Sequence, residues 1–169
     1  MKMTNLEDVF TDEMKDIYSA ENQIIKALPK MAKASQGQLK SAFEQHLEQT
    51  RTHTQRIEQV CQELNITPKG KKCAGMEGLI SEGAEVLETE GTEEAKEAAL
   101  IGAAQRVEHY EIAAYGTART HARQLGYSNA AELLEQTLRE ERKADDLLTQ
   151  IAESRVNPEA QHGDGKRGW

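Results

Sequence analysis

The chain has 169 residues, a formal net charge of −8 and 37% hydrophobic residues. This length supports one domain with a proper core, so neither disulfides nor a structural metal is needed merely to fold. The acidic balance argues against a nucleic-acid surface, and there is no apolar run long enough for a membrane span or a signal peptide, so we expect a soluble cytoplasmic protein. Cys61 and Cys73 show neither zinc-site nor disulfide spacing, and we interpret both as structural.

The composition predicts an all-helical fold, because aromatic residues make up only 4% of the chain while Ala and Glu are abundant. Capping and turn residues divide the sequence into helices expected at about 6–35, 37–65, 74–89, 93–125 and 128–156. Pro29 is expected to kink the first helix or to end it early. We expect one domain over residues 1–156 and a flexible C-terminal tail over 157–169.

The connections between these helices predict how they pack. The turns near residues 36 and 127 are short, so the helices on either side of each turn must be antiparallel neighbours. The middle connection is much longer and contains the short helix, so it can return the chain along the whole length of the molecule. The prediction is a ferritin-like antiparallel four-helix bundle, with a long crossover containing a short fifth helix between the second and third long helices.

Each long helix carries an apolar stripe with steps of three and four residues, and every stripe is interrupted near its middle. In the first helix, for example, Glu21 stands between Ile17 and Ile24, where an apolar residue belongs. The polar residues at the interruptions are Glu21 in the first helix, His46, Thr50 and His53 in the second, Glu108 and Glu111 in the third, and Glu141 in the fourth.

Hairpin geometry places these interruptions at one level. A turn near residue 36 sets Glu21 opposite about residue 51, and a turn near 127 sets Glu111 opposite about residue 143, close to Glu141. Both polar layers therefore fall in the middle of the bundle. Carboxylates gathered there would be costly to ionise without a compensating charge.

A cation provides that charge, because internal carboxylates together with imidazole are the ligand set of non-haem di-iron and di-manganese bundles. The i, i+3 spacing of two of the glutamates brings both onto one helix face. We predict one or two iron or manganese ions per chain, bound by Glu21, His53, Glu108, Glu111 and Glu141. The alternative is a metal-free network of buried, protonated carboxyl groups.

Four further residues belong to this hypothesis with other roles. Asp145 lies one turn after Glu141 and either binds metal or faces solvent. His46 and Thr50 are interpreted as hydrogen-bonding groups behind the ligands. Tyr115 is first of all a packing residue, and a redox role beside the metal is the less favoured alternative.

Five segments of the chain resemble the YciF/YciE family of bacterial ferritin-like proteins: EDVFTDEMKDIYSAENQIIKALPKMAKAS, AFEQHLEQT, KKCAGMEGLISEG, AALIGAAQRVEHYEIAAYGTA and LREERKADDLLTQIA. The resemblance covers about residues 3–155 and is most specific in VEHYEIAAYGT. It implies a ferritin-like four-helix bundle, usually dimeric, that is linked to bacterial stress responses.

The broader pattern of rubrerythrins and bacterioferritins places one Glu and then an ExxH motif on each helix pair. By this resemblance, Glu21 and Glu108 match the single glutamates. Glu111 matches an additional carboxylate of rubrerythrin-like proteins, and Glu141 matches the Glu of the last ExxH.

Two positions depart from that pattern. Thr50 stands where the first ExxH has its Glu, and Ala144 stands where the last ExxH has its His. Asp145 or His46 is the candidate to substitute. Because of these departures, two alternatives stay open: a complete di-iron centre, or a site that is partly occupied or holds a single metal ion.

Three functions follow from these residues. The first is a non-haem di-metal oxidoreductase, of peroxidase or oxidase type, that reduces peroxide or oxygen. The second is a non-enzymatic dimeric stress protein with a degenerate metal site, and the third is an iron-storage cage. The expected partners are a second copy of the chain and a small oxidant such as peroxide, with no nucleic acid and no membrane.

Overall fold

The computed structural model describes residues 3–162. Its long helices are α1 (Leu6–Lys33), α2 (Gly37–Glu63), α4 (Glu93–Gln124) and α5 (Ser128–Ile151), and α3 (Ala74–Glu88) is shorter. A π-helical turn (Ala152–Val156) and α6 (Asn157–His162) follow α5. No strand occurs within residues 3–162, so the predicted all-helical class is confirmed.

Local sequence explains where these helices begin and end. The Asn5 side chain caps α1 by accepting a 2.8 Å hydrogen bond from the backbone N–H of Asp8. Gly37 and Gly126 have φ angles of 53° and 77° at the two short turns, a conformation that glycine adopts without steric cost. The helix α1 continues through Pro29 to Lys33, so an early end at this proline is wrong. The last turn survives the missing hydrogen bond because it buries apolar side chains on both sides of the proline.

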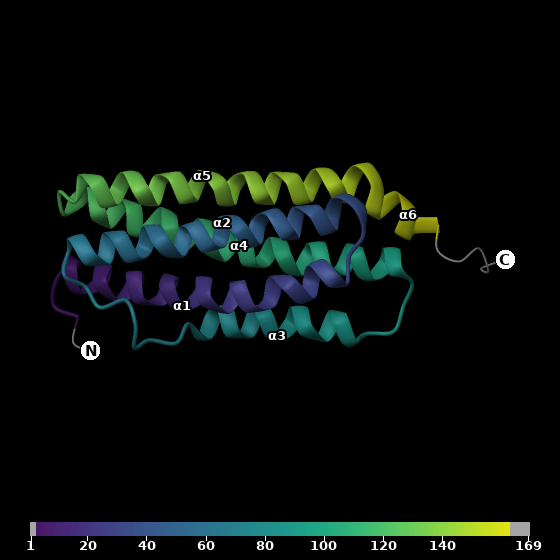
Figure 1. Cartoon of the computed structure of the whole chain (residues 1–169), viewed down its shortest axis with the longest axis horizontal. Helices are drawn as coiled ribbons and strands as arrows, with labels where there is room; N and C mark the ends of the chain where they lie inside the picture. The colour runs from purple at the N-terminus through teal and green to yellow at the C-terminus, as the bar shows by residue number, and fades with distance from the viewer. Residues whose placement is uncertain (1–2, 163–169) are drawn as a thin grey trace.

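The four long helices lie side by side along a common direction (Figure 1). The helix α1 contacts α2 and α4, and α5 contacts the same two helices from the other side. Because the connection that carries α3 returns the chain along the molecule, α2 and α4 run in the same direction (Figure 1). The short helix α3 lies against α1 and α4.

Two apolar clusters fill the interior, and a polar layer separates them. One cluster includes Phe10 and Leu134, and the other includes Phe43 and Leu148. The glutamates and histidine predicted at the interrupted stripes lie between the clusters, each with 0–3% of its surface exposed: Glu21, His53, Glu108, Glu111 and Glu141. The interruptions therefore mark a real layer of buried polar side chains.

The predicted tail is helical over its first six residues, which form α6. Pro158 has no N–H to donate, and it directly follows the π-helical turn, where the backbone N–H of Asn157 donates to the carbonyl oxygen of Ala152. Just before it, Arg155 donates a 2.7 Å hydrogen bond to the buried carboxylate of Glu97, which also accepts from the backbone N–H of Gln36. Residues 163–169 of the predicted tail lie outside the described residues. No helix of the described chain is both long and apolar enough to cross a bilayer.

Candidate metal centre

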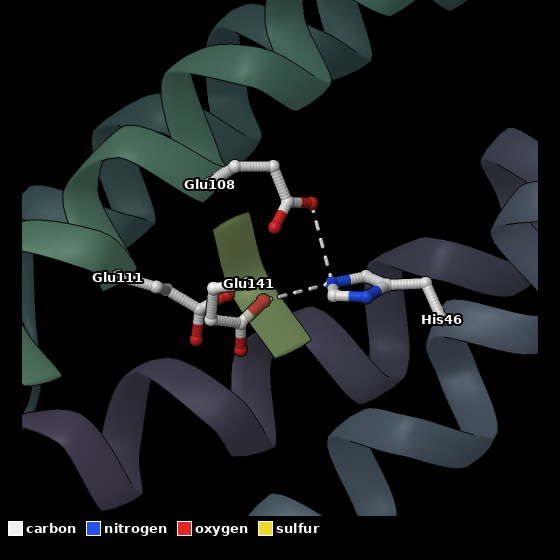
Figure 2. A group of neighbouring side chains, drawn as sticks. All are labelled: His46, Glu108, Glu111 and Glu141. Carbon is white, nitrogen blue, oxygen red and sulfur yellow. Dashed lines mark ion pairs between the residues drawn. The ribbon is translucent and has the colours of Figure 1, made fainter. Parts of the chain in front are cut away.

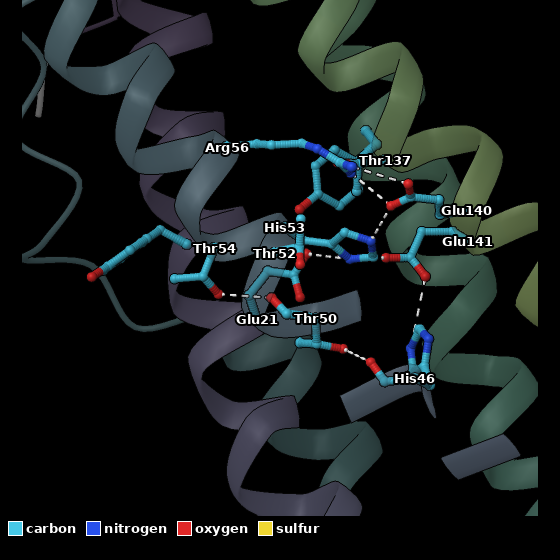
Figure 3. Close-up of polar contacts among 12 residues, drawn as sticks. Glu21, His46, Thr50, Thr52, His53, Thr54, Arg56, Thr137, Glu140 and Glu141 are labelled. Atoms are coloured by element: carbon cyan, nitrogen blue, oxygen red, sulfur yellow. Dashed lines mark hydrogen bonds and ion pairs between the residues drawn. The ribbon is translucent and has the colours of Figure 1, made fainter. Parts of the chain in front are cut away.

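Six buried side chains from the four long helices form two groups of potential metal ligands. In each group, one donor atom from every residue lies within 4.8 Å of the others. The His53 group consists of Glu21 on α1, His53 on α2 and Glu141 on α5; the His46 group consists of His46 on α2, Glu108 and Glu111 on α4, and Glu141 again. Figure 2 shows the His46 group, and Figure 3 shows the polar contacts around both histidines.

The His53 group is held by a chain of hydrogen bonds (Figure 3). The Nδ1 atom of His53 lies 2.8 Å from Glu141 Oε1 and 3.4 Å from Glu21 Oε1. The other ring nitrogen, Nε2, lies 2.8 Å from the carboxylate of Glu140. The Arg56 guanidinium donates two hydrogen bonds, of 2.6 and 3.0 Å, to the same carboxylate. A carboxylate on the far nitrogen of a histidine orients the ring and leaves the near nitrogen for a metal.

Charge reinforces this arrangement. Burial works to lower the pKa of His53, but hydrogen bonds to Glu140, Glu141 and Glu21 raise it to about 12. Burial works to raise the pKa of Glu140, but His53 and Arg56 lower it to about 2. His53 is therefore an imidazolium between carboxylates when no metal is bound. A cation at Nδ1 would replace the proton, because one lone pair binds only one of them.

Tyr115 closes the His53 group from α4. Its side chain is fully buried, and its hydroxyl donates a hydrogen bond to Glu21 Oε1. Burial and the nearby negative charge of Glu21 raise the pKa of Tyr115 well above its ordinary value, so the hydroxyl keeps its proton. Tyr115 is thus both the packing residue that the sequence predicts and a donor to a candidate ligand.

The His46 group has far fewer hydrogen-bond partners among the described residues. Figure 2 shows the two ion pairs that His46 makes within the group. The Nε2 atom of His46 lies 3.2 Å from Glu108 Oε1 and 3.7 Å from Glu141 Oε2. Neither ring nitrogen of His46 and neither oxygen of Glu111 has a hydrogen-bond partner among the described residues. Burial raises the pKa of Glu108 and of Glu111 well above the ordinary value, and the negative charge of Glu141 raises both further.

The donor set fits one or two divalent cations. Every residue of the two groups has at least one buried nitrogen or oxygen without a hydrogen-bond partner in the described chain. Buried polar atoms are nearly always partnered, and an ion is one of the few explanations for a cluster of exceptions. Four carboxylates balance the charge of two divalent ions, and carboxylate with imidazole suits iron and manganese.

The structure also shows what stands at the two departures from the ferritin-like pattern. The Thr50 hydroxyl donates a 2.8 Å hydrogen bond to the backbone oxygen of His46. The Ala144 side chain has no atom that could bind a metal. His46 lies one turn before Thr50 on the same face of α2, so it reaches the polar layer, where the sequence offered it as a hydrogen-bonding group or as a substitute ligand.

Asp145 lies outside both groups. Its carboxylate accepts a 3.1 Å hydrogen bond from Gln105 and lies 3.1 Å from the exposed ring of His109. Four residues make slightly more than one helical turn, so Asp145 is rotated away from Glu141 toward the edge of α4. Of the two alternatives that the sequence left open for Asp145, this position favours the one outside the ligand set.

Glu140 was not predicted, although it fixes the orientation of His53. Neighbouring residues on a helix do not share a face, so the stripe that passes through Glu141 cannot include Glu140. An available signal was Arg56, a cation three residues after His53 on the same helix, which pairs with Glu140 on the facing helix.

Two cavities reach the His46 group. One has a volume of about 330 Å³ and lies between α1, α3 and α4, and the other has about 130 Å³ and lies mainly between α2 and α5. His46 and Glu108 line both cavities, whereas Glu21 and His53 line neither. Ala144 lines the smaller cavity, so the missing histidine side chain leaves open space beside the group.

The helical fold and the buried layer of carboxylates and imidazoles define a helical protein with a candidate metal centre between its long helices. The chain belongs to the family described as a domain of unknown function, DUF892, whose model matches residues 5–161. It is 49% identical to Protein YciF of Escherichia coli (strain K12) over 164 residues, which cover 96% of this chain and 99% of that protein. The resemblance stated from the sequence is confirmed.

Solved structures agree with this assignment. The crystal structure of the E. coli stress protein YciF matches with a TM-score of 0.88 and 50% identity, covering 92% of this chain and 99% of that one. YcfI of Rhodopseudomonas palustris matches with a TM-score of 0.85 and 37% identity, covering 89% and 97%. A protein of Xanthomonas campestris pv. campestris, at 21% identity and a TM-score of 0.74, shares the fold.

Proposed function

We propose that this chain is a ferritin-like four-helix-bundle metalloprotein of the bacterial stress response. It binds a pair of iron or manganese ions in the His53 and His46 groups and reduces peroxide or oxygen. The observation that carries the proposal is the position of Glu141, which belongs to both groups and would offer one carboxylate oxygen to each. The unpartnered donors of both groups support it.

The metal pair would supply redox chemistry that no side chain of either group can provide. The protein's own residues position and protect it. Glu140 holds the ring of His53, and the Tyr115 hydroxyl orients Glu21. Glu108 and Glu111, whose pKa values are raised by burial, release protons when a cation binds. The smaller cavity gives a small oxidant access to the His46 group.

Metal content tests the proposal first. Protein purified without a metal-affinity tag is analysed for metals and then titrated anaerobically with Fe(II), beside the Glu108→Gln variant. We expect two equivalents per chain in the wild type and at most one in the variant. An Asp145→Asn variant is the matched control and should bind as the wild type does, because Asp145 lies outside both groups. A wild-type protein that retains no iron contradicts the proposal.

Activity is a separate measurement. Reconstituted protein should consume peroxide faster than the same concentration of free iron, and Glu108→Gln should lose this excess. If the metal binds but peroxide and oxygen are consumed no faster than by free iron, the non-enzymatic stress protein is the better description. We further propose a cytoplasmic homodimer, which size-exclusion chromatography with light scattering distinguishes from a storage cage.

A further inference from the structure

The cavity of about 330 Å³ has the shape and chemistry of a ligand site in its own right. Its volume lies at the lower end of the range of about 300–1,000 Å³ that is typical of small-molecule sites. Most of its lining is aliphatic, contributed by three helices, with Ile24 and Met31 from α1, Leu79 and Leu87 from α3, and Val107 from α4 among the wall residues.

Small residues create this space. Gly83 on α3 lies against α4, where a Cβ built on it would be 3.8 Å from the Cβ of Ala103. Ala84 and Ala104 also line the cavity, so the two helices approach each other without filling the gap beside α1.

The two ends of the cavity differ in polarity. His46 and Glu108, both more than nine-tenths buried and with unpartnered atoms, lie at its inner end. Lys26 and Lys30 are exposed lining residues and therefore stand at its mouth. Neither lysine forms an ion pair within residues 3–162, whereas Glu77, the acidic residue at the mouth, is paired with Lys72. The mouth thus carries uncompensated positive charge above an apolar chamber.

We propose that this cavity binds an unbranched aliphatic chain with an anionic head group, such as a medium-chain carboxylate. The carboxylate lies between Lys26 and Lys30, and the chain runs inward toward His46 and Glu108. An anionic head on an aliphatic chain matches the mouth and the wall of the cavity, because the lysines gain a counter-charge and the chain leaves water against the aliphatic lining. Binding depends on the cavity alone, and where the proposed metal pair is present the chain ends beside it.

Calorimetric titration with decanoate tests this inference on metal-free and metal-loaded protein. We expect saturable one-to-one binding in both forms, and at least tenfold weaker binding of decyltrimethylammonium, which has the same chain and the opposite charge. Because metal-free protein is titrated separately, a failure to bind metal and a failure to bind decanoate give different results. Absence of saturable decanoate binding in both forms overturns the inference.

Variants separate the two ends of the site. The double variant Lys26→Gln/Lys30→Gln should bind decanoate at least fivefold more weakly, while Lys33→Gln/Lys40→Gln, which changes two exposed lysines outside the lining, should not. Ala27→Leu fills the cavity from α1 and should abolish binding while far-UV circular dichroism stays unchanged. Unaltered binding in Ala27→Leu contradicts the inference. The inference is also contradicted if the wild type does not bind decanoate and Ala27→Leu changes the oligomeric state. In that case a second copy of the chain covers the cavity.

Discussion

The two halves of the candidate centre are built differently. His53 has a carboxylate oxygen 2.8 Å from each of its ring nitrogens, and Glu140, which hydrogen-bonds to Nε2, is held by Arg56. His46 has only two carboxylate oxygens at 3.2 and 3.7 Å and no hydrogen bond to either ring nitrogen. The cavities reach only the second of these histidines. A closed, oriented half thus adjoins an open, loosely held half.

This contrast indicates that the two groups have different roles. Ligands fixed by surrounding hydrogen bonds lose little freedom on binding a metal, so the His53 group is suited to hold an ion permanently. Ligands without such support can shift, and open space beside them admits other molecules. The His46 group is therefore the half where exchange and chemistry are expected, and Glu141 couples it to the fixed half.

The largest expected effect comes from removing the residue that the halves share. Glu141→Gln should reduce bound metal from two equivalents to below about one, because both groups lose a charged ligand. Metal-free protein should also be destabilised by about 3–5 kcal/mol, since the buried His53 imidazolium loses a partner. Elemental analysis and denaturant unfolding measure the two effects.

Glu97→Gln is the matched control for that prediction. Glu97 is equally buried and accepts a hydrogen bond from Arg155, but it lies outside both groups. It should lower stability and leave metal content unchanged. Two equivalents of metal in Glu141→Gln would show that the halves do not share this ligand.

The next effect separates the halves. Glu140→Gln should weaken metal binding by about 10–100-fold at the His53 group only, because the ring of His53 loses its orienting carboxylate. A two-phase Fe(II) titration should show one phase shifted and the other unchanged. Glu135→Gln, on the same helix and paired with Arg119, is the control and should shift neither phase. Equal weakening of both phases would contradict a separately supported half.

The sequence predicts which residues form the polar layer well, but it predicts the contacts between them poorly. Apolar periodicity reports the depth of a residue, so Glu21 and Glu141 are found at the positions where a stripe is interrupted. Periodicity says nothing of which partner a buried group meets, and so Glu140 was missed. The sequence also left open whether Asp145 and His46 are ligands, because their distances from the layer depend on small rotations about the axes of α5 and α2.

The fold could be predicted more directly from the sequence, because single residues mark the helix boundaries. These are the turn at Gly37, the cap at Thr92 and the turn at Gly126. The cavity beside α3 was not predicted at all. It arises from how α3 docks on α1 and α4, and no helical pattern encodes how three helices pack against one another.

A third prediction concerns pH. In metal-free protein, burial raises the pKa of Glu108 and Glu111, and carboxylate partners raise that of His53 to about 12. A group whose pKa is higher in the folded than in the unfolded protein contributes its full stabilisation at pH values below its unfolded pKa. This contribution is lost as pH rises toward its folded pKa. Glu140 acts oppositely, because its lowered pKa stabilises the protein above about 4.5 and this contribution disappears as pH falls toward 2.

Metal-free protein should therefore lose stability as pH rises above about 4.5, by about 1.4 kcal/mol per pH unit for each extra proton that the folded state binds. Metal-loaded protein should gain stability from pH 6 to pH 8, because the cation takes the place of those protons. Thermal melts of both forms at pH 5, 6.5 and 8 measure the difference. Parallel profiles would show that the ionisable layer is not where the metal binds.

The smallest effect is expected at Tyr115, whose hydroxyl donates to Glu21 in the fixed half. Tyr115→Phe leaves a buried carboxylate oxygen with one partner fewer, which costs about 1–3 kcal/mol. A bound cation would satisfy that oxygen, so the loss should be clear in metal-free protein and small in metal-loaded protein. Tyr127→Phe removes a hydroxyl that bonds Glu7 at the surface, and it should change neither form measurably. An equal loss in both forms would mean that no bound cation satisfies Glu21 in place of the hydroxyl, whereas no loss in either form would mean that Tyr115 acts through packing alone.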